Sequence, residues 1–206
     1  MTRQTLGLNG KILVFIAVLA VATLAPAQDK KETFNAMAVN MGTGPTGSTT
    51  IQITIERWSI EEERAALLVA LKEKGHGDFM KLLRDQKQTG FIRSRGALSQ
   101  ANPMPSTRLH YAWQYVADGQ RHIMLITDRT ITMAEQRANR RSLEYDTTAI
   151  KMQFPLMKEG DKKLPNGTGL LYAALKIKYD GEKKRLEVEE WGSEPVRLTD
   201  IAQTTK

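Results

Sequence analysis

The side chains that most often carry enzyme chemistry are sparse in this sequence. It has no cysteine and three histidines, at positions 76, 110 and 122. This composition excludes disulfides, thiolate nucleophiles and cysteine-ligated metal sites, and it leaves few ligands for zinc. The G-x-S-x-G, H-E-x-x-H, phosphate-loop and calcium-loop motifs are also absent from the sequence. The sequence therefore predicts neither a metal nor a cofactor.

Carboxylates are the remaining candidates for catalysis. Glu187 and Glu189 stand two residues apart on an expected strand and would share one of its faces. Such a pair could serve a cell-envelope hydrolase that uses strand-borne carboxylates. Lys176 is expected opposite Glu187, however, and this cross-strand partner favours surface acids. The acidic run at 61–63 opens an expected helix, where negative charge complements the helix dipole.

Three glycines suggest a nucleotide-binding loop at first sight. Gly42, Gly44 and Gly47 have the spacing G-x-G-x-x-G. A dinucleotide site also needs a helix directly after these glycines, because the helix N-terminus holds the pyrophosphate. The segment that begins at Thr49 is expected to be a strand instead. A flexible connection between two strands is therefore the favoured interpretation.

The clearest local pattern is a β-hairpin. Segments Thr107–Ala117 and Gln120–Thr127 are joined by Asp118-Gly119, a pair that suits a type I′ turn. A two-residue turn places Ala117 opposite Gln120 and sets the register of the whole hairpin. In this register His110 and His122 project from opposite faces and cannot share one site.

One face of this hairpin is rich in aromatic side chains. The candidate ligand-binding residues on it are Tyr111, Trp113, Tyr115, Met124 and Ile126. These side chains could line a cavity for an apolar ligand. The simpler alternative is ordinary core beneath a helical layer, because large apolar side chains usually serve packing.

A strand and a helical hairpin precede these candidates. Ile51, Ile53 and Ile55 alternate with polar residues, as in a strand with one buried face. A helix is expected from Ser59 to Gly75, with Ser59 and Glu62 as a capping box. A second, shorter helix is expected from Asp78 to about Lys87. We expect the two helices to lie on one face of a sheet.

The second half of the chain supplies more strand patterns. Expected strands are a hairpin formed by 170–179 and 184–191, a strand at 148–157, and a short edge strand at 195–201. A four-residue loop at 180–183 would place Ile177 opposite Leu186, but it would also place Lys178 opposite Arg185. These elements predict an α+β fold: a mostly antiparallel curled sheet or partly closed barrel, with an inserted helical hairpin packed on one face.

The N-terminus carries an export pattern. Arg3 and Lys11 precede an apolar run at 12–24, and Ala25-Pro26-Ala27 resembles a cleavage site. The run is shorter than the roughly 20 residues of a membrane-spanning helix, which favours a signal peptide over an uncleaved anchor. We expect a cleavable signal peptide at 1–27, a polar tail at 28–32 and a single α+β domain at 33–206. No further segment is apolar enough to predict a transmembrane helix in the mature chain.

Net charge bears on the expected partners. The 206-residue chain has a formal net charge of +7. An anionic envelope surface is therefore one possible partner. Since the basic residues are scattered and form no continuous stripe, a solvated surface is favoured and no nucleic acid is expected.

Four segments resemble a group of uncharacterised exported bacterial proteins. They are Phe34-Asn35-Ala36-Met37-Ala38, Ile55-Glu56-Arg57-Trp58-Ser59, Glu62-Glu63-Arg64-Ala65-Ala66-Leu67-Leu68 and Ser193-Glu194-Pro195-Val196-Arg197-Leu198-Thr199. The resemblance covers most of the chain after the signal peptide. It implies bacterial export and one compact domain, and it implies no activity or functional residue.

These observations lead to one expected function and two alternatives. The expected function is that of an exported, periplasmic or extracellular, non-enzymatic binding protein for an apolar small molecule or an envelope partner. The alternatives are the carboxylate hydrolase described above and a structural protein associated with the envelope.

Overall fold

The structure is a computed structural model that describes residues 31–39, 48–94, 106–129, 147–160, 164–191 and 194–204. The two helices are α1 (Glu61–Lys74) and α2 (His76–Asp85). The strands are β1 (Glu32–Val39), β2 (Ser48–Ile55), β3 (Gly90–Ser94), β4 (Thr107–Leu109), β5 (Tyr111–Ala117), β6 (Gln120–Thr127), β7 (Thr147–Pro155), β8 (Gly167–Asp180), β9 (Arg185–Trp191) and β10 (Val196–Gln203). The predicted signal peptide at 1–27 and the glycines at 42–47 lie outside the described residues.

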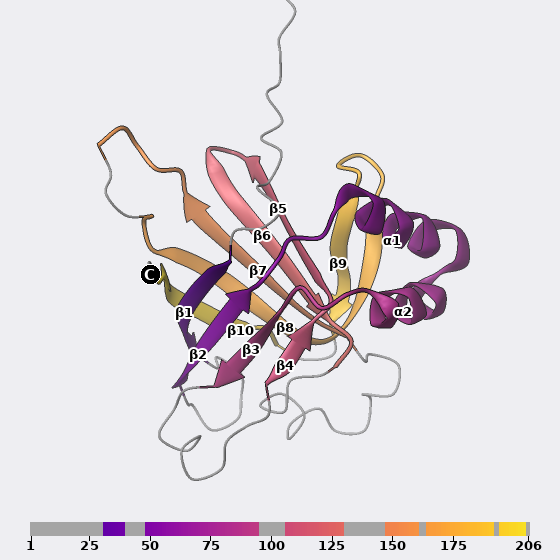
Figure 1. Ribbon diagram of the computed structural model, residues 1–206, viewed down its shortest axis with the longest axis horizontal. Helices are drawn as coiled ribbons and strands as arrows, with labels where there is room; N and C mark the ends of the chain where they lie inside the picture. Colours follow the sequence, from indigo (N-terminus) through magenta and orange to yellow (C-terminus); the bar gives the residue numbers. More distant parts are fainter. Residues whose placement is uncertain are drawn as a thin grey trace, which may run out of the picture.

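All the strands join one antiparallel sheet (Figure 1). Its order is β4-β3-β2-β1-β10-β8-β7-β6-β5, and β9 pairs with β8 outside this path. Two meanders, β1–β4 and β5–β8, are therefore joined through β10. The prediction of an edge strand at 195–201 was wrong in this respect. Pro195 lies just before β10, so the strand keeps its backbone donors and can pair on both sides.

The two ends of this sheet belong to one segment of the chain. β4 pairs with β3 and β5 pairs with β6, and only His110 separates β4 from β5 in the sequence. The His110 amide still donates to the carbonyl oxygen of Ile126, at 3.0 Å. The sheet curls strongly, but its hydrogen-bond ladder stays open between β4 and β5. The α+β fold with a curled antiparallel sheet is confirmed, and the barrel alternative is not supported.

The predicted register of the β5–β6 hairpin is confirmed. Ala117 pairs with Gln120, and the pairing continues to Tyr111 opposite Ile126. Asp118 and Gly119 have φ angles of 52° and 68°, as a type I′ turn requires. A local turn signal was therefore sufficient to set the seven residue pairs between β5 and β6.

The β8–β9 hairpin differs from its predicted register by two residues. Ile177 pairs with Val188 and Lys178 pairs with Glu187, because the four-residue loop covers 181–184 instead of 180–183. From the turn to Ile177, a shift of two keeps the side chains on their predicted faces. Beyond Ile177 a bulge shifts the register by one more residue, so that Lys176 pairs with Glu190. The shift of two also removes the clash of Lys178 with Arg185, since Arg185 now pairs with Asp180. Opposite charges thus favour the observed register.

The curled sheet wraps around the larger of two apolar clusters. Phe34, Ile53, Leu125, Phe154 and Leu198 are among its fully buried members, and they come from five different strands. A polar group borders this core at β1, where Glu32 accepts hydrogen bonds from Arg121. The tail predicted at 28–32 therefore ends before Glu32, which is a buried residue of β1.

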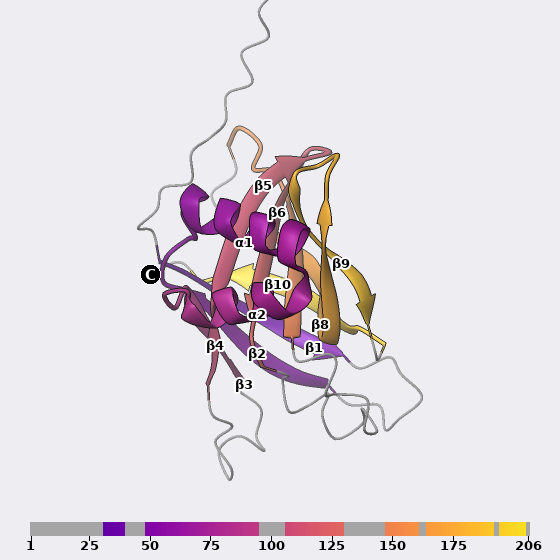
Figure 2. The ribbon, with the colours of Figure 1, turned by 90° about the vertical axis from the view of Figure 1, so that its right-hand side faces the viewer.

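The helical hairpin covers the other face of β5–β8, as predicted (Figure 2). Leu67 of α1 and Phe79 and Leu83 of α2 are fully buried in the second apolar cluster. The sheet contributes Tyr111 and Ile126 to the same cluster. One part of this sheet face is thus sealed by the helices.

The start of α1 differs from the predicted capping box. Ser59 does not cap the helix: its Oγ accepts a hydrogen bond from the Ala112 amide, at 3.1 Å, and the residue is buried. Ile60 is the N-cap residue, and the carboxylate of Glu63, not of Glu62, accepts from the Ile60 amide at 3.1 Å. A bond to a distant strand therefore outcompetes the local cap.

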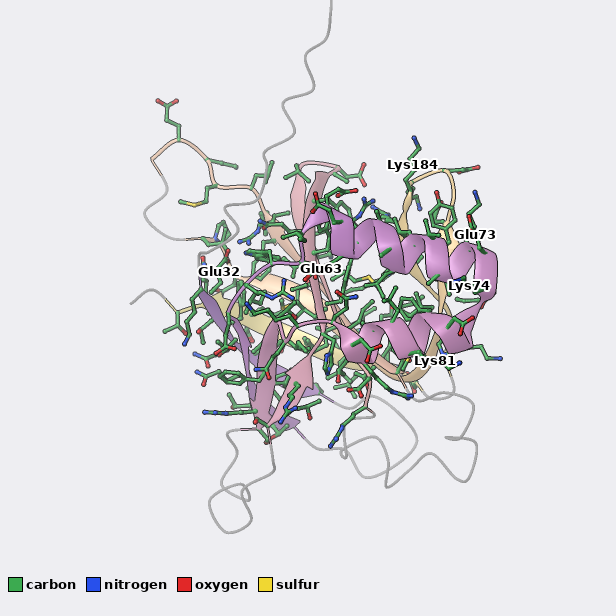
Figure 3. All side chains as sticks on the ribbon, turned by 45° about the vertical axis from the view of Figure 1, so that its right-hand side comes forward. Glu32, Glu63, Glu73, Lys74, Lys81 and Lys184 are labelled. Carbon is green, nitrogen blue, oxygen red and sulfur yellow. The ribbon has the colours of Figure 1, made fainter. Side chains whose placement is uncertain are left out.

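Glu63, which is labelled near the start of α1 in Figure 3, also anchors the helical hairpin as a whole. Arg57 donates to both of its carboxylate oxygens, at 2.8 and 3.0 Å. The same guanidinium donates to the carbonyl oxygens of Lys87 and Gln88, which follow α2. One arginine thus ties the entry of the hairpin to its exit.

Candidate functional site

A groove of about 480 Å³ opens on the helix-bearing face of the sheet, over the part of that face that the helices leave uncovered. Its lining comes from six strands, β5 to β10. The residues that face it include Tyr115, His122, Met124, Lys151, Gln153, Thr168, Leu170, Arg185, Glu187, Arg197 and Thr199. A volume of this size lies within the range of small-molecule sites.

Strand register explains how these side chains come together. Paired residues share a face of an antiparallel sheet, so the register predicts rows of side chains that run across the strands. One row reads Met124, Lys151, Leu170 and Arg197 from β6 to β10. The row beside it reads Tyr115, His122, Gln153 and Thr168 from β5 to β8. The next row on the other side, which includes Tyr111 and Ile126, lies under the helices.

The floor of the groove combines apolar and close-packed positions. Leu170 is 37% exposed there, although leucine side chains are usually buried, and Met124 lies in the same row. Gly169 also lines the groove, and a Cβ at this position would lie 2.4 Å from the Lys151 carbonyl oxygen. Glycine therefore lets β8 approach β7 closely at the floor.

A charge cluster stands where β9 faces the sheet. Glu187 accepts hydrogen bonds from Lys151 of β7 and from Nε of Arg185, the latter at 2.8 Å. Burial alone would raise the pKa of Glu187. The hydrogen bonds and charges of Lys151 and Arg185 outweigh burial and hold this pKa below its ordinary value. Glu187 is therefore ionised and paired at neutral pH.

Two stacked rings and a guanidinium group lie next to this cluster. The rings of Tyr115 and His122 are nearly parallel, with centroids 4.9 Å apart. The guanidinium carbon of Arg185 lies 4.3 Å from the centroid of the Tyr115 ring, a cation–π contact. Burial raises the pKa of Tyr115 above its ordinary value of 10.0, against the opposing charge of Arg185. The Tyr115 hydroxyl therefore stays protonated and can donate a hydrogen bond.

We predict that Glu187 makes stability more sensitive to acid. A group with a lowered folded-state pKa contributes stability above its ordinary pKa, here 4.5, and loses it as the pH falls through the folded value. Wild-type protein should therefore lose more unfolding free energy than Glu187→Gln between about pH 7 and about pH 3. Urea unfolding at several pH values measures the difference. Parallel pH profiles of the two proteins would contradict it.

The structure divides the five residues that the sequence singled out. Tyr115 and Met124 line the groove, although Met124 is only 6% exposed and also belongs to the second apolar cluster. Tyr111 and Ile126 are buried beneath the helical hairpin. Trp113 packs partly buried at the edge of the same cluster, with the guanidinium carbon of Arg64 4.8 Å from its ring centroid. The aromatic face therefore runs from the helix-covered core into the groove.

The groove also holds residues that sequence reasoning did not select. Leu170, which directly precedes the apolar Leu171, breaks the polar and apolar alternation expected of a strand with one exposed face, and this was a usable signal. Lys151 follows the alternation of β7 and gave no such signal. Arg197 gave none, because its place depends on the pairing of β10 with β8. Glu187 was considered with Lys176 as its cross-strand partner, whereas in the structure it pairs with Lys151 and Arg185.

Comparison with known proteins was negative: no protein-family model, curated protein or solved structure matches this chain. The resemblance to exported bacterial proteins therefore stays a prediction. Within the described ranges, no helix is long and apolar enough to cross a bilayer. The same residues contain no group of three or more histidine or carboxylate side chains placed to hold a metal ion.

The lining of the groove bears on the hydrolase alternative. Glu187 is the single carboxylate among its described residues, and two cations engage it. Glu189, the second acid of the proposed pair, is exposed and lies outside the lining. A two-carboxylate mechanism requires both acids to flank one substrate. The described groove does not favour such a mechanism.

Proposed function

We propose that this protein is an exported, non-enzymatic binding protein that holds a small molecule with an apolar body in the groove of β5–β10. The observation that carries the proposal is the exposed Leu170 on the groove floor, in one row with Met124. An apolar surface inside a concave site is the feature that small-molecule sites share. Covering it with an apolar ligand removes it from water.

Polar groups around this floor support a binding role as well. Tyr115 and His122 provide flat ring surfaces, and Gln153 and Thr168 provide amide and hydroxyl groups. A few polar groups around an apolar floor orient a ligand without requiring a reaction. The export pattern at 1–27 supports a location outside the cytoplasm, where such a protein would meet its ligand.

A competition assay tests the proposal. Decanol should displace the fluorescent neutral probe N-phenyl-1-naphthylamine from the full chain in a saturable manner. Leu170→Asn should weaken decanol binding about tenfold, because the exposed leucine side chain that decanol would cover is replaced by a polar one.

Leu156→Asn is the matched control. Leu156 is 42% exposed and does not line the groove. Both variants keep residues 1–30, so any binding of decanol to that apolar segment is common to them. Equal binding by the two variants, or no saturable binding at all, would refute the proposed function.

A further inference from the structure

Charge is unevenly distributed along the groove. Among its described lining residues, three side chains are cationic, Lys151, Arg185 and Arg197, and one is a carboxylate, Glu187. Glu187 receives a hydrogen bond from Lys151 on one oxygen and from Arg185 on the other. Its single negative charge is thus shared by two of the three cations. An excess of positive charge remains in the groove.

Arg197 is the cation that this pairing leaves out. It lies on β10, directly across from Leu170 on β8, and its side chain is exposed. Among the residues that the structure describes, none forms an ion pair or hydrogen bond with the Arg197 side chain. The hydroxyl group of Thr199 lies two residues along the same face of the strand and also lines the groove. A guanidinium in this position can donate its N–H groups to a ligand.

The apolar floor begins next to this guanidinium. Leu170 is the neighbour of Arg197 in the row, and Met124 lies further along it, beyond the Lys151 stem. A ligand that covers Leu170 therefore brings its other end close to Arg197. An arginine fork binds carboxylate and phosphate groups through two parallel hydrogen bonds. At the β9 end, the carboxylate of Glu187 would repel a second negative group.

We infer that the groove binds a free amphipathic anion, with its carboxylate or phosphate on Arg197 and its apolar part on Leu170 and Met124. This inference rests on the proposed function and adds the chemical class and orientation of the ligand. Carboxylate and phosphate are proposed together because both present two oxygen atoms that can accept hydrogen bonds from the guanidinium. The size of the groove matches a small molecule, in contrast to the surface of a bilayer.

Four ligands with the same ten-carbon chain test the inference: decanoate, decyl phosphate, decanol and decyltrimethylammonium. The two anions should bind the full chain about tenfold more tightly than decanol, and the cation should bind more weakly than decanol. Calorimetry at about 0.15 M salt measures each dissociation constant under physiological screening. Comparing decanoate with decyl phosphate identifies which head group Arg197 prefers.

Arg197→Gln should reduce the affinity for both anions about tenfold, to the level of decanol, and leave decanol binding unchanged. Arg108→Gln is the matched control, because Arg108 is exposed on β4 and lies outside the groove. This substitution removes the same charge as Arg197→Gln. It should change none of the four affinities. An equal loss in both variants would mean that general surface charge attracts the anions, and it would overturn the inference.

The outcomes separate this inference from the proposed function. Leu170-dependent decanol binding without any preference for anions would retain the function and refute the inference. Failure of all four ligands to bind would refute both. Vesicles of phosphatidylglycerol provide a further test. If the protein binds these vesicles through Arg197 but does not bind the free decyl anions, the site recognises a membrane surface. That result would overturn the inference of a free ligand.

Discussion

Replacing Arg121 with methionine should lower the free energy of unfolding by about 3–5 kcal/mol. Glu32 is only 8% exposed, and Arg121 donates to both of its carboxylate oxygens, at 2.9 and 3.0 Å. Without Arg121, the carboxylate keeps the amide of Gln203 as its described partner, at 2.9 Å. A buried charge that loses its counter-ion is costly because the protein interior solvates it poorly.

Urea unfolding monitored by tryptophan fluorescence measures this effect. Arg129→Met is the control, since Arg129 is exposed just beyond β6 and should change stability by no more than about 0.5 kcal/mol. Replacing both Glu32 and Arg121 with methionine should recover much of the loss, because no unpaired charge then stays buried. A loss below about 1 kcal/mol in Arg121→Met would show that water already solvates this pair.

Phe79→Ala should cost a similar amount, about 3–5 kcal/mol. The Phe79 ring on α2 is fully buried in the second apolar cluster, between the helical hairpin and the sheet. Removing it leaves a cavity that the rigid sheet below cannot fill. Because the cluster joins helices to β5–β9, we expect the whole domain to unfold at lower urea concentration.

Two spectroscopic signals decide whether the helices are integral to the domain. Circular dichroism in the far ultraviolet and tryptophan fluorescence should show one common transition in the variant. Phe91→Ala is the matched control, because Phe91 on β3 is only partly buried and should cost less. If the helical circular dichroism signal is lost at lower urea concentration while the transition of the sheet is unchanged, the helical hairpin unfolds independently of the sheet.

The parts of the fold that were predictable from the sequence depend on neighbouring residues. Asp118-Gly119 determined the hairpin register because a turn acts on the strands that it joins. Ile51, Ile53 and Ile55 indicated β2 because alternation is a local property. The helical hairpin was predictable for the same reason, and its packing on one face of the sheet was expected from the layered architecture of α+β folds.

The parts that failed depend on residues far apart in the sequence. Ser59 was expected to cap α1, but its hydroxyl finds the Ala112 amide instead, across 53 positions of sequence. β10 was expected at an edge, because a strand's own residues do not reveal whether both of its sides pair. The groove was not predictable as a unit, since Lys151, Leu170 and Arg197 meet only through the pairing of β7, β8 and β10.

The central position of β10 has a consequence for the order in which this chain can fold. Synthesis makes β10 after the other described strands, yet β10 supplies the ladder hydrogen bonds that join the two meanders into one sheet. A nascent chain without residues 196–203 would leave β1 and β8 with unpaired edges and the inner core open. Completion of the sheet therefore waits for the final strand, and such non-local pairing is slow.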